Sequence, residues 1–583
     1  MKTNRILVAA LALITLASCN KQSLEEEAPA FNGEKSYLTV KIAQTNAGTK
    51  ATGDDTNPFY YGTADEQAVV SATFFFYNAD GSYNTVVSRS IYEERAETSG
   101  QGNKNVEWIG KGVVLLTNVS AKPKYMAVVL NADDALINAL TGKSSTDAED
   151  VLTTKIATQD ATAGTWTNFV MTSSSYVNGN TAGYYLNTLQ DSDFKSTEAE
   201  ALASTSPVEV YVERLAVKIE LKLNNTTSTN QYKIGKTTID GADKDLYAKI
   251  DNWGLNATTR NTYGYKLIDP SWTLSFNGSS WSDPTNFRTY WGKSTNYGIT
   301  TYYPDSFGNS TDSRNYDGTK EILDYVSYNE LAVATGSAAY CRENTNDPAS
   351  FDATEPLNYN STFTSILLKA TLVDDAGAAL NVINYKGQLF TVDGYKARIL
   401  EYCKSLDADK YIPWKAGSAA GTYVQVSADD FETPVDLHDG YTGLEFKDGT
   451  YYQKNGTSYD ALTAEEATKM LNYGDKASTE TTYDNTLALY YVDGQMYYTV
   501  PVEHLNNGYK YNNIDGNTVV EGDYGVVRNH YYSVTVNSIK NLGNAVYDPD
   551  EKIIPNDKTL QKYFLSAQVN ILSWKLVNQT VDL

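Results

Sequence analysis

Alternation of apolar and polar residues is the dominant pattern along this chain. In residues 36–43, Leu38, Val40 and Ile42 fall on one side, while Thr39 and Lys41 fall on the other. Because successive side chains of a strand point to opposite faces, this alternation predicts a half-buried strand. Further apolar runs predict strands over residues 72–77, 113–117, 125–131, 365–373 and 531–539.

The longest alternating run covers residues 208–223 and reads VEVYVERLAVKIELKL. Its apolar positions keep the period of a strand but shift phase once, near Glu213. A strand of this length with a change of phase predicts a junction between two domains.

Turn and cap signals divide the C-terminal half. Asp448-Gly449 and Asp493-Gly494 each lie between two apolar runs, and Asx-Gly pairs supply the positive φ angles of type I′ hairpin turns. Helical spacing predicts short helices within residues 133–148 and over residues 395–406. Thr463 to Glu466 forms a capping box that predicts a further short helix through about residue 471.

Composition agrees with a mainly β protein of more than one domain. A chain of 583 residues is too long for a single core. Its 46 tyrosines and 39 glycines favour many short strands joined by tight turns. The formal net charge of -24 argues against nucleic acid as a partner, because polyanions repel each other.

The first 19 residues have the features of an export signal. Lys2 and Arg5 precede an apolar run, residues 6–16, that is too short to span a bilayer as a mature helix. The run ends in Leu16-Ala17-Ser18-Cys19, which resembles a bacterial lipobox and predicts lipid attachment at Cys19. The alternative is an ordinary signal peptide with an incidental cysteine. No later segment approaches 18 consecutive apolar residues, so the rest is expected outside the membrane.

The sequence contains no recognisable catalytic or metal-binding motif. His438, His504 and His530 share no ligand spacing, and no nucleophile-elbow, zincin or phosphate-loop pattern occurs. The stretch 240–245, DGADKD, lacks the downstream Glu of a calcium loop and is interpreted as a solvated turn. We therefore expect no enzyme activity, no cofactor and no metal site.

Two further residue sets leave alternatives open. Cys341 and Cys403 could pair in an oxidising compartment, although the sequence cannot give their separation. The aromatic pair Tyr290-Trp291 suggests a glycan platform, but core or interdomain packing is the preferred interpretation.

Several segments together resemble the Bacteroidales major and minor fimbrillin family, also called Mfa-like or FimA-like. Both termini contribute: the lipobox with its following strand, and the ending Val569 to Leu583 with Trp574-Lys575. The internal segments are FVMTS at 169–173, VER at 212–214 followed by AVK at 216–218, YCRENT at 340–345 and VVRNHYY at 526–532. The resemblance spans most of the chain, its specificity lies in the order of the motifs and in both termini, and the C-terminal end looks like the tail of the minor-fimbria stalk subunit.

This resemblance implies two β-sandwich-like, transthyretin-like domains with a few short helices. The expected organisation is a signal peptide at 1–19, a tether and removable first strand at 20–50, an N-terminal β domain at 51–208, a C-terminal β domain at 209–563 and a donor strand at 564–583.

It also implies maturation by proteolysis of an outer-membrane lipoprotein precursor. The family's protease usually cuts after Arg, whereas the matching position here is Lys50, in a loop rich in small and polar residues. A trypsin-like or Lys/Arg-specific protease would then leave Ala51 as the first residue, and cleavage at another site is the alternative. Cleavage would remove the lipid and the first strand together.

Assembly by donor-strand exchange is the third implication. The C-terminal segment of one copy would fill the vacated groove of the next, and the residues expected to do so are Val569, Ile571, Leu572, Trp574, Leu576, Val577 and Val581. The expected function is a stalk subunit of a surface fimbrium, with other copies and the anchor and tip subunits as partners. The alternatives are a tip or anchor subunit, or a monomeric surface lipoprotein that binds glycan through Trp253, Trp281 or Trp291. A further alternative makes the C-terminal segment an ordinary last strand of its own domain.

Overall fold

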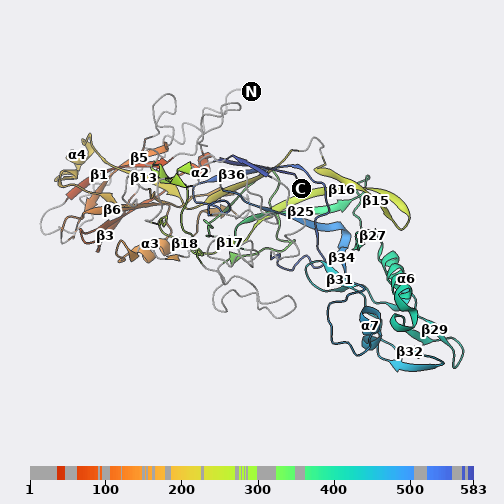
Figure 1. Cartoon of the computed structure of the whole chain (residues 1–583). Coiled ribbons are helices and arrows are strands. Elements are labelled where there is room, and N and C mark those ends of the chain that lie inside the picture. The colour runs from red at the N-terminus through yellow and green to blue at the C-terminus, as the bar shows by residue number, and fades with distance from the viewer. Residues whose placement is uncertain are drawn as a thin grey trace. The chain divides into compact units, whose positions relative to one another are not determined.

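The computed structural model is mainly β with a few helices, as the alternating sequence pattern predicts (Figure 1). The predicted fold class is therefore confirmed. The structure describes residues 36–45, 62–89, 92–94, 106–117, 119, 121–147, 151–152, 155–160, 165–176, 185–224, 229–269, 275–276, 279–280, 282–283, 287–298, 323–347, 362–504, 521–554, 567–570 and 576–582.

The chain divides into two compact units. The N-terminal unit contains the described parts of residues 1–46, 62–214 and 263–289, and the C-terminal unit contains those of residues 215–262 and 290–583. The boundaries expected from the sequence, 51–208 and 209–563, stay predictions.

One large mixed sheet builds the N-terminal unit. Its strand order is β3-β2-β6-β10-β13-β1-β5-β4, with β11 paired to β6 and β12 paired to β1. The bounds are β1 Ser36–Thr45, β2 Ala72–Tyr77, β3 Tyr83–Arg89, β4 Tyr92–Glu94, β5 Val106–Leu116, β6 Tyr125–Leu130, β10 Met171–Ser173, β11 Asn187–Thr188, β12 Phe194–Lys195 and β13 Val208–Arg214.

Short capped helices accompany this sheet: α2 (Ala64–Gln67), α3 (Asp134–Leu140) and α4 (Glu198–Leu202). The helix predicted within 133–148 is α3, and the Asp133 side chain caps it by accepting from the backbone N–H of Leu136. The unit also contains two-stranded pairs: β8 (Thr158–Asp160) with β9 (Thr165–Thr167), β19 (Ser275–Phe276) with β20 (Ser279–Ser280), and β21 (Ser282–Asp283) with β22 (Arg288–Thr289).

Two five-stranded sheets share one core in the C-terminal unit. The first has the order β24-β14-β36-β39-β38, and the second β15-β16-β25-β35-β37. Apolar side chains from both sheets, such as Ile219, Val534, Trp253 and Leu368, belong to one buried cluster. The bounds are β14 Val217–Leu223, β15 Gln231–Ile239, β16 Ala242–Asn256, β24 Ala338–Cys341, β25 Ser365–Val373, β35 Gln495–Pro501, β36 Tyr531–Ser538, β37 Asn544–Ala545, β38 Ala567–Asn570 and β39 Leu576–Asp582.

A second core in this unit lies between residues 382 and 491. Helices α6 (Val392–Tyr411) and α7 (Ala464–Tyr473) contribute to it, and α7 begins at the predicted capping box on Thr463. Its sheets are β27-β26-β34-β31-β30 and β29-β28-β32-β33. The bounds are β26 Val382–Tyr385, β27 Gln388–Phe390, β28 Trp414–Ala416, β29 Tyr423–Gln425, β30 Val435–Asp436, β31 Tyr441–Gly443, β32 Tyr451–Asn455, β33 Ser458–Leu462 and β34 Ala488–Tyr491.

Both predicted Asx-Gly hairpins are wrong. Asp493 and Gly494 do adopt positive φ angles of 50° and 73°, but the strands on either side, β34 and β35, belong to different sheets. Around Asp448-Gly449, β31 and β32 likewise enter different sheets. The dipeptide sets only the local backbone. Around Asp493 the flanking strands are buried in different cores, since Tyr490 belongs to one cluster and Met496 to another.

The long alternating run at 208–223 is two strands. β13 ends at Arg214 and β14 begins at Val217, and the two enter different sheets. The compact units also divide between Arg214 and Leu215. The phase shift read near Glu213 therefore corresponds to a change of sheet. Among the described residues, no helix combines the length and apolar character needed to cross a membrane.

Candidate functional site

Strand β1 occupies a slot in the middle of the N-terminal sheet (Figure 1). On one side it runs antiparallel to β5, with ten paired positions from Ser36 opposite Leu116 to Thr45 opposite Val106. On the other side it runs parallel to β13, from Val40 opposite Val208 to Gln44 opposite Val212. Both edges of β1 are therefore paired, and removing it would open the edges of β5 and β13 at once.

The side chains of β1 are more buried than the alternation suggests. Leu38, Val40 and Ile42 are buried as expected, but Tyr37 and Thr39 are buried too. The prediction of a half-buried strand is wrong for this stretch because α4 covers the second face, where Tyr37 packs with Leu115 and Ala201.

Two polar contacts fix the register of β1. The hydroxyl of Thr39 donates to the carbonyl of Ala201 in α4. The Lys41 Nζ lies 2.7 Å from Oε1 of Glu209 in β13, and these side chains are 33% and 47% exposed. An ion pair this exposed contributes about 0.2–1 kcal/mol, so its main effect is on register.

The C-terminal strands lie in the first sheet of the C-terminal unit. β39 pairs in parallel with β36, from Tyr531 opposite Leu576 to Ser538 opposite Asp582. β38 pairs antiparallel with β39 and ends the sheet. Of the predicted donor residues, Val569 belongs to β38, and Leu576, Val577 and Val581 belong to β39.

The other predicted site residues lie outside the described residues. These are the lipidation residue Cys19, the cleavage pair Lys50-Ala51, and the donor residues Ile571, Leu572 and Trp574.

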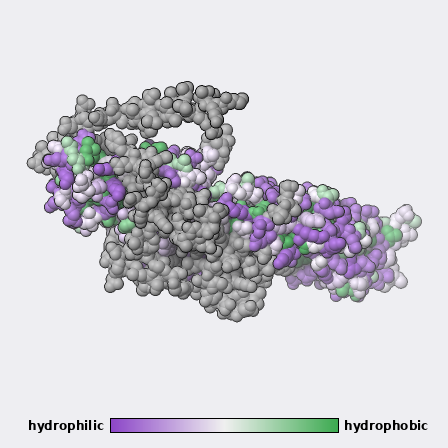
Figure 2. Space-filling model, turned by 90° about the horizontal axis from the view of Figure 1, so that it is seen from above, coloured by the Kyte–Doolittle hydropathy of each residue, from purple (hydrophilic) through white to green (hydrophobic). Residues whose placement is uncertain are grey.

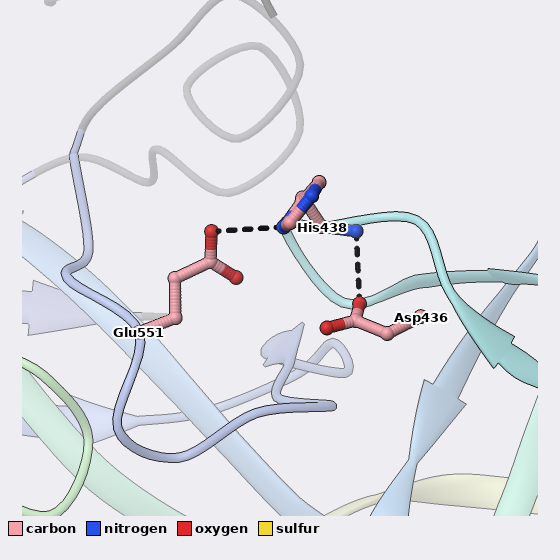
Figure 3. Close-up of side chains that lie close together, drawn as sticks. All are labelled: Asp436, His438 and Glu551. Carbon is pink, nitrogen blue, oxygen red and sulfur yellow. Dashed lines mark hydrogen bonds and ion pairs between the residues drawn. The ribbon is translucent and has the colours of Figure 1, made fainter. Parts of the chain in front are cut away.

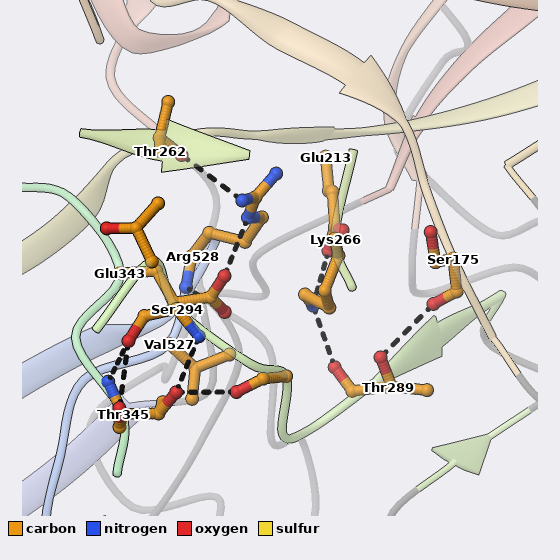
Figure 4. A network of polar contacts seen from close by, with 12 residues as sticks. Ser175, Glu213, Thr262, Lys266, Thr289, Ser294, Glu343, Thr345, Val527 and Arg528 are labelled. Atoms are coloured by element: carbon orange, nitrogen blue, oxygen red, sulfur yellow. Dashed lines mark hydrogen bonds and ion pairs between the residues drawn. The ribbon is translucent and has the colours of Figure 1, made fainter. Parts of the chain in front are cut away.

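Two internal segments named for the resemblance meet in a buried network in the C-terminal unit (Figure 4). The Nε of Arg528 donates to Oε2 of Glu343 at 3.1 Å, and a terminal nitrogen of the same guanidinium donates to the Thr262 hydroxyl at 3.2 Å. The neighbouring Asn344 donates to the carbonyls of Ala257 and Thr362. Arg528 of VVRNHYY and Glu343 and Asn344 of YCRENT are therefore hydrogen-bonded to each other or to loop residues inside the core.

A comparable network lies in the N-terminal unit, around Glu213 of the VER segment (Figure 4). Lys266 Nζ lies 2.8 Å from Glu213 Oε2 and donates to the Thr289 carbonyl at 3.0 Å, while the Thr289 hydroxyl donates to the Ser175 carbonyl. Both charged side chains are fully buried. Buried pairs of this kind cost desolvation energy, so they specify one arrangement more than they stabilise it.

One group of side chains in the described part of the chain could hold a cation: Asp436, His438 and Glu551 (Figure 3). Their possible ligand atoms lie within 4.8 Å of one another, with His438 Nδ1 3.4 Å from Glu551 Oε1. Burial, together with the Glu551 and Asp548 carboxylates, raises the pKa of Asp436. The spacing of the three residues in the sequence carries no motif that would have indicated the group. In the 240–245 stretch, by contrast, Asp240 and Gly241 form the turn between β15 and β16, both with positive φ, and residues 242–245 belong to β16.

The aromatic residues considered for glycan binding are core residues where the structure describes them. Trp253 and Trp291 are fully buried, and the Trp253 indole N–H donates to the Ala334 carbonyl at 3.0 Å. Trp281 lies outside the described residues. The glycan alternative therefore loses two of its three candidates, because both side chains are needed to fill cores.

The two mature cysteines are free and buried, so the disulfide alternative is not realised in this structure. Burial raises the pKa of both thiols to about 12. On the face shown in Figure 2, hydrophilic residues predominate over the described surface and hydrophobic ones are scattered. Large exposed apolar side chains include Val70, Leu202, Leu406, Val424 and Leu487.

Comparison with solved structures gives only weak likenesses. A candidate cell adhesion protein of Parabacteroides distasonis has 11% identity and a TM-score of 0.32, covering 93% of this chain and 98% of its own. A candidate cell adhesion protein of Bacteroides eggerthii has 10% identity and a TM-score of 0.28, covering 96% and 100%. The tip fimbrial protein Mfa3 of Porphyromonas gingivalis, truncated at its C-terminus, has 11% identity and a TM-score of 0.26, covering 60% and 83%. At these TM-scores the likenesses carry no further conclusion.

The sequence itself gives a more specific match. No curated protein matches the chain in sequence. Residues 489–580 match the family described as "Major fimbrial subunit protein type IV, Fimbrillin, C-terminal". This segment includes β35, β36 and most of β39. The resemblance inferred from the motifs is thereby confirmed: residues 489–580 of this chain are similar to the C-terminal part of the fimbrillin family of fimbrial subunit proteins.

Proposed function

We propose that this protein is the stalk subunit of a cell-surface fimbrium and polymerises by protease-assisted donor-strand exchange. The observation that carries the proposal is the placement of β1, a strand near the N-terminus that is paired on both edges in the middle of a sheet. Only four residues lie between the end of β1 and Lys50, the predicted cleavage residue.

Cleavage after Lys50 would convert a folded precursor into an acceptor. Water would add across the Lys50–Ala51 peptide bond, leaving a carboxylate on Lys50 and a new amine on Ala51. The strand and the lipid on Cys19 could then leave together. Before exchange, β1 is held in place by five buried side chains: Tyr37, Leu38, Thr39, Val40 and Ile42.

A strand that replaces β1 in the slot restores the large stabilisation that is lost when β1 leaves. Each apolar side chain that fills the slot contributes roughly 1.5–3 kcal/mol, which gives about 10 kcal/mol for five or six of them before entropic costs. Main-chain pairing with β5 and β13 adds to this, as in other complexes formed by strand addition. A second copy of the chain can supply such a strand from residues 564–583.

In this structure β39 pairs with β36 of its own unit, so donation requires that pairing to be exchanged. A stalk subunit needs both a slot and a donor strand, and the chain has a candidate for each. A tip subunit would need no donor strand toward a further copy, and an anchor subunit would keep its lipid.

Truncation tests the proposal. A chain that ends at Ser573 should be exported and cleaved, yet should not polymerise. Because removing β39 also uncovers the edge of β36, the full-length variant Trp574→Asp is a second test that leaves the chain length unchanged. Fimbriae of normal length from both variants, seen by electron microscopy, would show that this segment is not the donor strand.

A further inference from the structure

The sequence of β1 has a counterpart near the C-terminus. Residues 36–45 read SYLTVKIAQT, and residues 570–579 read NILSWKLVNQ. The two segments agree in polar or apolar class at every position. The agreement is closest in the centre, where LTVKI at 38–42 corresponds to LSWKL at 572–576.

We propose that residues 570–579 of a second copy enter the slot in the register of this correspondence, with Lys575 paired to Glu209. The proposal rests on the proposed function and adds the register and the residues that select it. Leu572, Trp574 and Leu576 would then take the places of Leu38, Val40 and Ile42, all of which are buried.

The polar positions of the slot support this register. Lys41 is paired with Glu209 at 2.7 Å, and Lys575 would bring the same charge to the same carboxylate. The Thr39 hydroxyl donates to the Ala201 carbonyl, and Ser573 would bring a hydroxyl to that position. An incoming strand displaced by one residue would place its apolar side chains on the opposite face.

The one large change, Val40 to Trp574, lies beside a part of β5 that has no side chain on the same face. In β5 the residue opposite Val40 is Gly112, and the residue opposite Ile42 is Gly110. Directly opposite residues of neighbouring strands share a face, and neither glycine has a side chain there. An indole at the position of Val40 can therefore extend over β5 without displacing a cross-strand side chain.

A second register is the main competitor. It would place Val569 and Ile571 at the positions of Val40 and Ile42, and Asn570 at that of Lys41. In that register no lysine reaches Glu209, and Ala567 replaces the larger Leu38. The two registers differ by five residues, or about 17 Å along a strand.

Cross-linking between copies distinguishes the registers. Lys111 of β5 lies opposite Lys41, so the proposed register brings position 575 of one copy opposite position 111 of the next. Full-length Lys111→Cys protein is mixed with full-length Lys575→Cys or Asn570→Cys protein, matured with protease and treated with a short bis-maleimide. Cys341 and Cys403 are buried, which keeps background reaction low.

A covalent dimer from position 575 and none from position 570 is the expected result. A dimer from position 570 alone would overturn the register but leave donor-strand exchange in place. Assembled fimbriae that give a dimer from neither position would overturn both proposals.

A charge reversal tests the role of Glu209 separately. Glu209→Lys and Lys575→Glu should each slow polymerisation about fivefold, and the double variant should recover to within about twofold. Glu330→Lys and Lys552→Glu, which alter another exposed ion pair, should leave the rate unchanged. If the double variant is as slow as the two single effects combined, Lys575 does not meet Glu209.

Discussion

Arg528 and Glu343 form a buried ion pair in the C-terminal unit, with Nε 3.1 Å from Oε2 and side chains 1% and 2% exposed. Glu343→Ala should therefore lower the free energy of unfolding by about 3–5 kcal/mol, because the guanidinium would lose its carboxylate inside the core. Urea unfolding of the purified protein measures this.

Glu330→Ala, which removes one partner of the exposed pair with Lys552, is the matched control and should cost about 1 kcal/mol or less. Equal losses from the two variants would contradict the importance assigned to the buried pair.

Glu503 should make stability fall as the pH rises. Burial and the nearby Asp523 carboxylate raise the pKa of Glu503 from 4.5 to about 8. The folded state therefore holds a proton that the unfolded state releases above about pH 4.5, so stability declines between pH 4.5 and 8. Glu503→Gln removes this titration. The variant should melt at a higher temperature than the parent at pH 8.5, and the difference should shrink toward pH 4. A difference independent of pH would refute the assignment.

Lys50 is expected to set the mature N-terminus. Lys50→Ala should leave a precursor that keeps β1 in its slot, is exported but does not polymerise, whereas Lys50→Arg should mature normally. Edman sequencing of assembled wild-type protein should begin at Ala51. A start at Cys19 would instead favour an anchor subunit or a monomeric lipoprotein.

Cys19 is expected to carry the lipid of the precursor. Cys19→Ala should abolish labelling with a palmitate analogue and prevent surface assembly, because the precursor would lose its membrane anchor. Cys403→Ala is a control for labelling, since that thiol is buried and its pKa is raised to about 12. Unchanged labelling of the Cys19 variant would rule out lipidation at this residue.

Local signals predicted many elements of this protein correctly. The apolar runs at 72–77 and 365–373 are the strands β2 and β25 with the same bounds, and the capping box at Thr463 begins α7. These succeed because side-chain alternation and cap hydrogen bonds are decided within a few residues. Of the motifs that carried the resemblance, VVRNHYY at 526–532 lies within the fimbrillin match over 489–580.

Which strands pair when they are distant in sequence was decided only by the tertiary structure. The turn at Asp493-Gly494 forms, yet its flanking strands enter different sheets. Helix α6 begins three residues before the predicted 395, at Val392, because Thr391 caps its start, and the non-helical backbone of Asp407 separates its last turn from the rest.

The same distinction holds at the candidate site. The sequence alone determined that residues 36–43 form a strand with Leu38, Val40 and Ile42 on one face. That β1 lies between β5 and β13 was decided by the tertiary structure, and the contacts of Thr39 with Ala201 and of Lys41 with Glu209 join residues more than 160 positions apart. Alternation specifies the faces of a strand, but its neighbours depend on which apolar surfaces are buried together when the sheet assembles.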